Sequence, residues 1–192
     1  MGHCVTYIKF CDLDVSANLV LLLKYYVIKT STGGSKMKNA LGVSLGICAL
    51  VWTYIALFVL GDYVQVWGGF IAWGAYFTVG KDALSKTVTA TIYGSILAAI
   101  AVILHGYLGV VGDLAWPVAV GVTVWGLTAL PKCPNIPANV FGYAATFGFM
   151  LLASNMEVLA TDFSNPVIMM SVSFVLGSIA GLASEKVAGM LG

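Results

Sequence analysis

Residues that could hold a metal ion or perform acid–base chemistry are few in this chain and poorly spaced for either task. The sequence has two histidines, four cysteines and no arginine. His3-Cys4 with Cys11 matches no standard metal-ligand spacing, and the phosphate-loop, nucleophile-elbow and zinc-protease motifs do not occur in the sequence. Two histidines do not make a His-based catalytic centre of a familiar kind. We therefore expect no enzyme activity, no metal site and no cofactor.

Aromatic side chains offer a different chemistry, that of an apolar gate. In two expected helices, 63–80 and 137–156, aromatic and small residues recur at helical spacing, with Gly74, Ala144 and Gly148 on the same faces. A narrow apolar constriction between these helices excludes hydrated ions and admits a small neutral solute. Helix packing, lipid contact and anchoring at the membrane interface are the alternative roles. The predicted lining consists of Trp67, Phe70, Phe77, Phe141, Thr146 and Phe147.

Polar residues near the expected helix ends are candidates for the two mouths of such a path. His105 and Glu157 fall toward one side, and Lys81 and Lys132 toward the other. His105 is a candidate proton sensor, with a water-bonded interface histidine as the alternative. Thr146 provides a hydroxyl in mid-membrane, for which a bond back to its own helix is the expected role. No charged residue lies in the centre of an expected span, whereas coupled transporters usually need one.

The charge pattern predicts how the chain crosses a membrane. Hydrophobic residues make up 60% of the chain and charged residues 9%, which indicates an integral membrane protein. With six spans, all nine lysines fall in alternate connections and at the two ends, and the other connections carry only acidic charges. Cytoplasmic loops retain positive charge, so both termini are expected in the cytoplasm. The net charge of +1 gives no reason to expect a nucleic-acid partner.

We predict an all-α integral membrane protein with a leader and a single transmembrane domain. Residues 1–38 are the cytoplasmic or interfacial leader, with an amphipathic helix at Val15–Ile28, and residues 39–192 form the transmembrane domain. Pro117 in the short fourth span either begins a helix or marks an irregular site. The six predicted spans are 39–60, 63–80, 88–111, 115–130, 137–156 and 166–188.

Short similarities between the two halves are consistent with an inverted duplication of three plus three helices. Small residues four apart (Gly42 and Gly46, Gly177 and Gly181, Gly68 and Ala72) also predict close helix packing and subunit contacts. At an offset of 74 positions, Val66-Trp67-Gly68 aligns with Val140-Phe141-Gly142. At an offset of 73 positions, Val51-Trp52 aligns with Val124-Trp125. The stretch Gly94-Ser95-Ile96 is similar to Gly177-Ser178-Ile179.

Two of these stretches carry a resemblance to known proteins. Val66–Phe77 and Pro137–Phe147 are similar to the second-span and fifth-span signatures of a family of small bacterial inner-membrane proteins of unknown function, over roughly residues 40–188. With its lysine-bearing leader, the whole chain resembles the low-CO2-inducible plasma-membrane proteins of green algae. That resemblance implies inorganic-carbon uptake in a carbon-concentrating mechanism, through passive or gated CO2 permeation at the plasma membrane.

The charge pattern favours CO2 over bicarbonate as the solute. An anion in hydrocarbon needs a compensating positive group, and the spans have none at their centres. Helix N-termini supply part of such a charge, so a bicarbonate transporter is one alternative, and a non-transporting assembly subunit of a carrier complex is another. The expected partners are the lipid bilayer and further copies of the chain, with a trimer as the working assumption.

Overall fold

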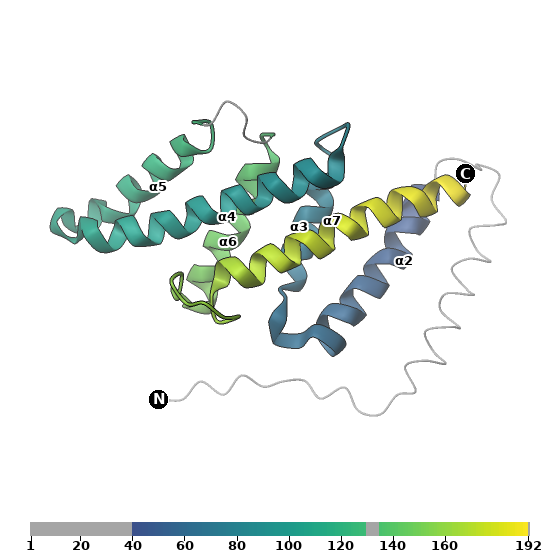
Figure 1. Ribbon diagram of the computed structural model, residues 1–192, viewed down its shortest axis with the longest axis horizontal. Helices are drawn as coiled ribbons and strands as arrows, with labels where there is room; N and C mark the ends of the chain where they lie inside the picture. Colours follow the sequence, from purple (N-terminus) through teal and green to yellow (C-terminus); the bar gives the residue numbers. More distant parts are fainter. Residues whose placement is uncertain (1–39, 130–134, 192) are drawn as a thin grey trace.

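The computed structural model describes residues 40–129 and 135–191, and this part of the chain is helical and contains no strand (Figure 1). The helices follow one another in the predicted order. The leader and Lys132 lie outside the described residues. The α-helices are α2 (Ala40–Tyr54), α3 (Val66–Tyr76), α4 (Ala83–Tyr107), α5 (Ala115–Gly126), α6 (Ala138–Ala153) and α7 (Pro166–Leu191).

The helices differ in length more than the predicted spans do. Three helical stretches are long and apolar enough to cross a membrane, Ala40–Tyr63, Ala83–Gly126 and Pro166–Leu191, and Ala138–Ala153 is a shorter apolar helix. α3 has 11 residues and α5 has 12. At 1.5 Å per residue they are about 16 and 18 Å long, against about 30 Å of hydrocarbon. Membrane-helix character is therefore present, but the α-helices of three of the six predicted spans, α3, α5 and the 16-residue α6, are shorter than about 30 Å.

Tight turns at glycine account for part of this shortening. Ile55–Leu60 is a π-helix and Gly61–Tyr63 a 3-10 turn, so α3 begins only at Val66. Between α4 and α5, the 3-10 segment Leu108–Leu114 contains Gly112 at φ 58° and ψ −130°. Residues with a side chain rarely adopt this conformation. The chain reverses there, and α4 ends four residues earlier than the predicted third span.

Two closely packed helix pairs form the centre of the bundle, α3 with α7 and α4 with α6. A Cβ atom added to Gly177 would lie 2.0 Å from the carbonyl oxygen of Gly69, and one added to Gly94 would lie 1.9 Å from that of Asn139. Only glycine allows the backbones to approach so closely. α2 packs on α7 and α5 packs on α4, so these two helices lie on the outside of the central four.

The predicted small-residue pairs have two different environments. Gly177 and Gly68 face atoms of the partner helix within their own pair, as the packing prediction required. Gly42 and Gly46 on α2 have no atom within 4 Å of an added Cβ. Intramolecular packing therefore explains Gly68 and Gly177 but does not explain the glycines of α2.

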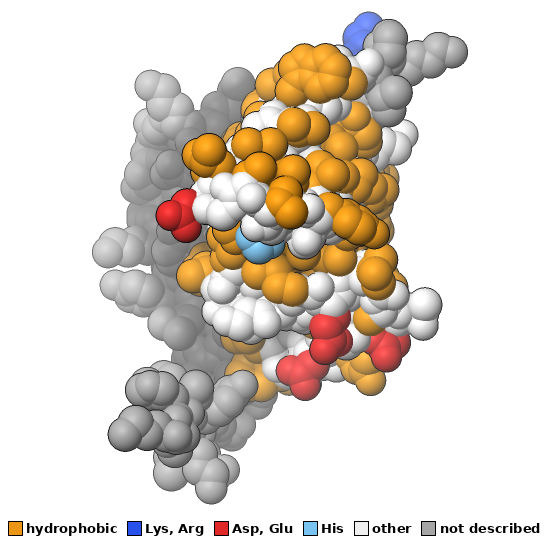
Figure 2. Space-filling model, turned by 90° about the vertical axis from the view of Figure 1, so that its left-hand side faces the viewer, with side chains coloured by type: hydrophobic (Ala, Val, Ile, Leu, Met, Phe, Trp, Pro, Cys, Tyr) orange, Lys and Arg blue, Asp and Glu red, His pale blue; other side chains and the backbone are white. Residues whose placement is uncertain are grey.

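Acidic and basic connections lie at opposite ends of the described bundle. In Figure 1 the α3–α4 connection, which contains Lys81, is at the top, and the α2–α3 turn and the α6–α7 loop, with Asp62 and Glu157, are at the bottom. Figure 2 shows a basic side chain at the top of one face and acidic side chains at its middle and lower parts. Hydrophobic side chains cover much of the surface between them. The α3–α4 connection also contains Asp82, so the lysine end of the bundle is not purely basic, and the predicted membrane orientation stays a prediction.

Candidate permeation site

A hollow of about 510 Å³ lies between the first half of α3 and the second half of α6. We call it the α3–α6 groove. Its walls are almost entirely apolar, with Met170 of α7 behind them and the amide of Gln65 at one end. The groove lies between the helices that correspond to the second and fifth predicted spans. α3 contributes Trp67, Gly68 and Ile71, and α6 contributes Ala144, Gly148 and Leu152.

Of the six predicted lining residues, only Trp67 borders this groove. Its side chain is 74% exposed, and its ring centroid lies 6.2 Å from that of Phe70. Phe70 turns the other way and stacks on Trp73 at 5.8 Å, within a cluster that includes Trp52 of α2. Phe70 therefore helps to pack α2, α3 and α7, and its ring does not face α6.

The other predicted aromatics are spread over separate environments. Phe141 is 36% exposed, and Phe77 is 44% exposed at the far end of α3. Phe147 stacks on Tyr143, with centroids 5.8 Å apart, and meets the ring edge of Trp116 at 5.5 Å. These rings join α5 to α6. The predicted lining residues share helical faces, but the structure does not bring them together around one space.

His105, predicted at the outer mouth, extends this aromatic contact to α4. Its imidazole stacks on the indole of Trp116 with centroids 3.9 Å apart and an interplanar angle of 14°. Trp116 immediately precedes Pro117 near the start of α5. The stack fixes the α4–α5 reversal, so His105 has a packing partner in addition to any contact with water.

Thr146 is fully buried, and its hydroxyl donates a hydrogen bond to Ser95 Oγ of α4 at 2.8 Å. The expected bond back to its own helix is replaced by one between helices. A neutral hydrogen bond of this kind contributes about 1 kcal/mol. In this arrangement Thr146 joins α6 to α4, and its donor is already used.

A second hollow, of about 620 Å³, lies at the other end of α3, where the chain turns into α4. We call it the lysine-side hollow because Lys81 lines it, as predicted for an inner mouth residue. Asp82 and Glu185 also line it, and the hydroxyl of Tyr76 donates a hydrogen bond to the Glu185 carboxylate. Because the acidic groups offset the single lysine, this hollow carries no excess of positive charge.

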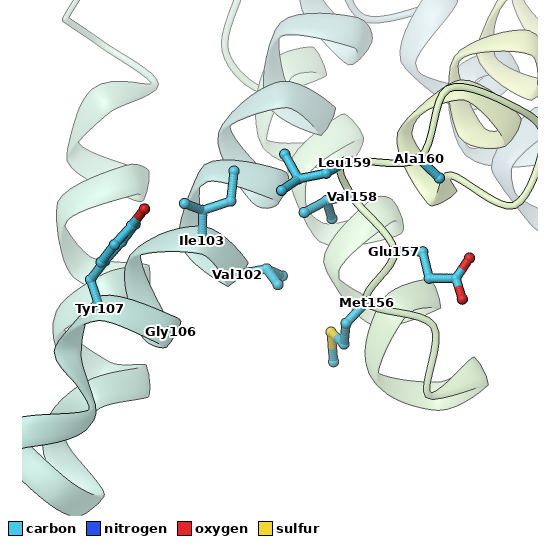
Figure 3. A pocket seen from close by; sticks show the side chains of 9 residues that line it. All are labelled: Val102, Ile103, Gly106, Tyr107, Met156, Glu157, Val158, Leu159 and Ala160. Atoms are coloured by element: carbon cyan, nitrogen blue, oxygen red, sulfur yellow. The ribbon is translucent and has the colours of Figure 1, made fainter.

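A third hollow, of about 520 Å³, lies between the end of α4 and the α6–α7 loop, where Glu157 was predicted to mark the outer mouth. Val102, Ile103 and Tyr107 of α4 face Met156–Ala160 across it (Figure 3). In Figure 3 the Glu157 carboxylate points away from Val102 and Ile103. The hollow is therefore apolar toward α4, and its acidic group is directed outward.

The α6–α7 loop beside this hollow is held by its own hydrogen bonds. Asn165 Nδ2 donates to the carbonyl oxygens of Val158 and Ala160, at 3.0 and 2.8 Å. Asp162 accepts from the hydroxyl and the backbone N–H of Ser164, at 2.6 and 2.9 Å. Hydrogen bonding to Ser164 lowers the pKa of Asp162 below its ordinary value because it favours the charged carboxylate.

The family of the chain follows from comparison with known proteins. Residues 42–189 match the model of a family described as "Protein of unknown function (DUF1097)". The chain belongs to this family. No curated protein and no solved structure matches the chain. The family match spans nearly all of α2 through α7, so whatever the DUF1097 members share lies in these helices.

A stripe of hydroxyls on α4, inside the DUF1097 region, was missed by the sequence reasoning. Thr87, Thr91 and Ser95 are all fully buried. Thr91 Oγ1 bonds back to the Thr87 carbonyl at 2.8 Å, and Ser95 accepts from Thr146. Thr87 Oγ1 is the one buried side-chain oxygen or nitrogen without a partner in residues 40–129 and 135–191. The four-residue spacing of these hydroxyls is a signal that the sequence does contain.

Proposed function

We propose that the protein is a passive membrane channel that admits a small uncharged solute along α3. The supporting observation is that hollows lie at both ends of this helix, the α3–α6 groove beside its first turns and the lysine-side hollow beside its last. α3 has 11 residues, about 16 Å in length. Residues 72–75 of α3 line neither hollow and form the barrier in the proposed path.

The proposed solute is CO2, taken up at the plasma membrane as the resemblance to the low-CO2-inducible algal proteins implies. α2, α3, α5 and α6 contain no Asp, Glu, Lys or His. An anion in this interior would lack a compensating charge, and a neutral molecule needs none. Bicarbonate is disfavoured because Asp82 and Glu185 accompany Lys81 in the hollow where an anion would enter.

In the proposed arrangement all six helices lie in the bilayer and both termini are cytoplasmic. The opposite placement of the Lys81 connection and the α6–α7 loop supports this orientation. The short helices α3 and α5 then reach the membrane surfaces through their turns and hollows. The proposed homo-oligomer, with a trimer as the working assumption, has a candidate interface at Gly42 and Gly46, which no side chain of the described chain covers.

We also propose that the two halves form an inverted repeat in which α2, α3 and α4 correspond to α5, α6 and α7. Under this correspondence the contact between α3 and α7 is equivalent to that between α6 and α4. The contact between α2 and α7 is likewise equivalent to that between α5 and α4. The close approach of Gly177 to Gly69 corresponds to that of Gly94 to Tyr143, at offsets of 83 and 74 positions. Two such matches in space support the duplication more strongly than the sequence echoes alone.

The channel is tested by gas flux into vesicles that contain the purified protein. Cholesterol-rich vesicles keep the background CO2 permeability low, and internal carbonic anhydrase with a pH-sensitive dye reports entry by stopped flow. Gly148→Leu places a large side chain in the α3–α6 groove, where an added Cβ has no atom within 4 Å. We expect it to reduce the protein-dependent flux by more than half.

Gly121→Leu on α5 is the matched control, because an added Cβ there also meets nothing within 4 Å. We expect it to leave the flux unchanged. Wild-type flux no higher than that of empty vesicles would reject the channel, and equal flux in both variants would reject the groove as its path. Phe70→Ala and Phe147→Ala test the predicted lining, and unchanged flux in both would show that these rings only pack the bundle.

A further inference from the structure

Thr87 differs from the other buried threonines of the described chain in how its hydroxyl is used. Thr91 and Thr123 bond back to carbonyl oxygens four residues earlier, both at 2.8 Å, and Thr146 bonds to Ser95. Thr87 is fully buried, yet its Oγ1 has no protein partner. Buried polar atoms are almost always hydrogen-bonded, so a water molecule or a bound solute is expected to complete the hydrogen bonding of this hydroxyl.

The position of Thr87 is defined by its neighbours on the same face of α4. Ala83 and Ala90, one turn to either side, pack in a single cluster with Ala75 of α3 and Ala138 of α6. Thr87 thus lies where α3, α4 and α6 meet. Ala83 also lines the lysine-side hollow. One helical turn, about 6 Å, separates that hollow from Thr87.

The proposed repeat gives Thr87 a counterpart on the other half of the molecule. Met170 follows Thr87 by 83 positions, the same offset that relates Gly177 to Gly94. Met170 lines the α3–α6 groove, where it faces Gly68. Thr87 therefore occupies, near the lysine-side hollow, the position that Met170 occupies in the groove. Where Met170 has a thioether, Thr87 has a shorter side chain with a hydroxyl donor that no protein group accepts.

We propose that Thr87 is the polar binding position of the permeation path, where its hydroxyl donates a hydrogen bond to an acceptor oxygen of the permeating solute. The solute class is a small, uncharged molecule that accepts a hydrogen bond, which includes CO2. This inference rests on the proposed channel function. The solute enters from the lysine-side hollow, passes Ala83 and loses its contact with water next to Thr87, where the donor replaces a water molecule.

Thr87→Val tests the inference because it keeps the shape of the side chain and removes only the hydroxyl. We expect about a fivefold loss of protein-dependent CO2 flux, the size of effect that one neutral hydrogen bond produces. Thr87→Ser retains a donor and should keep most of the flux. Thr91→Val is the matched control on the same helix, since the Thr91 hydroxyl bonds to its own backbone, and its flux should stay near that of the wild type.

A stability measurement on the same variants separates solute binding from a structural role. No protein hydrogen bond is lost in Thr87→Val, so its unfolding temperature in detergent should equal or exceed that of the wild type. A lower unfolding temperature, as expected if the hydroxyl held a structural water, would overturn the inference. Normal flux in Thr87→Val together with reduced flux in Gly148→Leu would also overturn the role of Thr87, but it would leave the proposed channel intact. Absence of flux in the wild type would overturn both the role of Thr87 and the channel.

Discussion

Replacement of Gly177 by alanine tests the packing on which the fold depends. The added Cβ would lie 2.0 Å from the Gly69 carbonyl oxygen, whereas carbon–oxygen contacts between helices are about 3.3 Å or longer. α3 and α7 must then separate by about 1.3 Å at this point. Overpacking of this kind costs about 1–3 kcal/mol, and the upper part of that range applies because a backbone carbonyl cannot rotate away. Alanine regains up to about 1 kcal/mol in helix propensity.

We therefore expect Gly177→Ala to lose about 1–2 kcal/mol of unfolding free energy in total. Gly94→Ala, at the equivalent α4–α6 contact, should lose a similar amount. Gly121→Ala on α5, where an added Cβ meets nothing within 4 Å, isolates the propensity gain and should be as stable as the wild type or more so. Reversible unfolding of the purified protein in mixed micelles measures all three. If Gly177→Ala were as stable as Gly121→Ala, the close approach of α3 and α7 would be wrong.

Three further outcomes are expected. In a double-mutant cycle, Thr146→Val and Ser95→Ala should show a coupling energy of about 1 kcal/mol, and additive losses would disprove their hydrogen bond. The pKa of Asp162 is lowered in the folded state, so its stabilising effect is complete at neutral pH and is lost as the pH falls below the ordinary value of 3.8. Asp162→Asn should therefore make the unfolding free energy depend less on pH in this acid range. An unchanged dependence on pH would show that the Ser164 contact is not maintained. Gly46→Leu should convert the proposed oligomer to monomers in native mass spectrometry, and persistence of the oligomer would place its interface elsewhere.

The order of the helices and one feature of the site were predictable from the sequence. Apolar runs separated by charged connections predict where helices occur, because burial in lipid requires both the apolar surface and the internal hydrogen bonds. A groove does lie between the second and fifth helices, α3 and α6, and Gly148 lines it. The permeation path itself stays a prediction.

Helix lengths and the directions of the aromatic rings were not predictable in the same way. Hydropathy does not register the π-helix at Ile55–Leu60, because its residues are all apolar. The reversal at Gly112 does fall in the predicted connection between the third and fourth spans. Helical spacing places Trp67 and Phe70 near one face, but it does not say which neighbour each ring will meet. Phe70 packs with Trp73 because α2 and α7 approach that side of α3.

The hydroxyl partners depended on contacts between helices that no single segment specifies. A bond from Thr146 back to its own helix is the usual local solution, but Ser95 of α4 lies within reach and provides another. The two residues are separated by 51 positions, and only the tight packing of α4 on α6 brings them together. Thr87 was overlooked for a related reason, because its significance lies in the absence of a partner.

The shortness of α5, which lies on the outside of the bundle, has a consequence for the lipid around it. An apolar helix of about 18 Å leaves roughly 12 Å of a 30 Å hydrocarbon layer unmatched, and the bilayer adapts by thinning at its edge. Such a collar of compressed lipid would itself conduct apolar gases faster than the undisturbed membrane. In the proposed channel, acyl-chain length is then a control on permeation that acts outside the polypeptide. Longer-chain lipids should lower the gas flux of this protein more than that of a protein built from full-length helices.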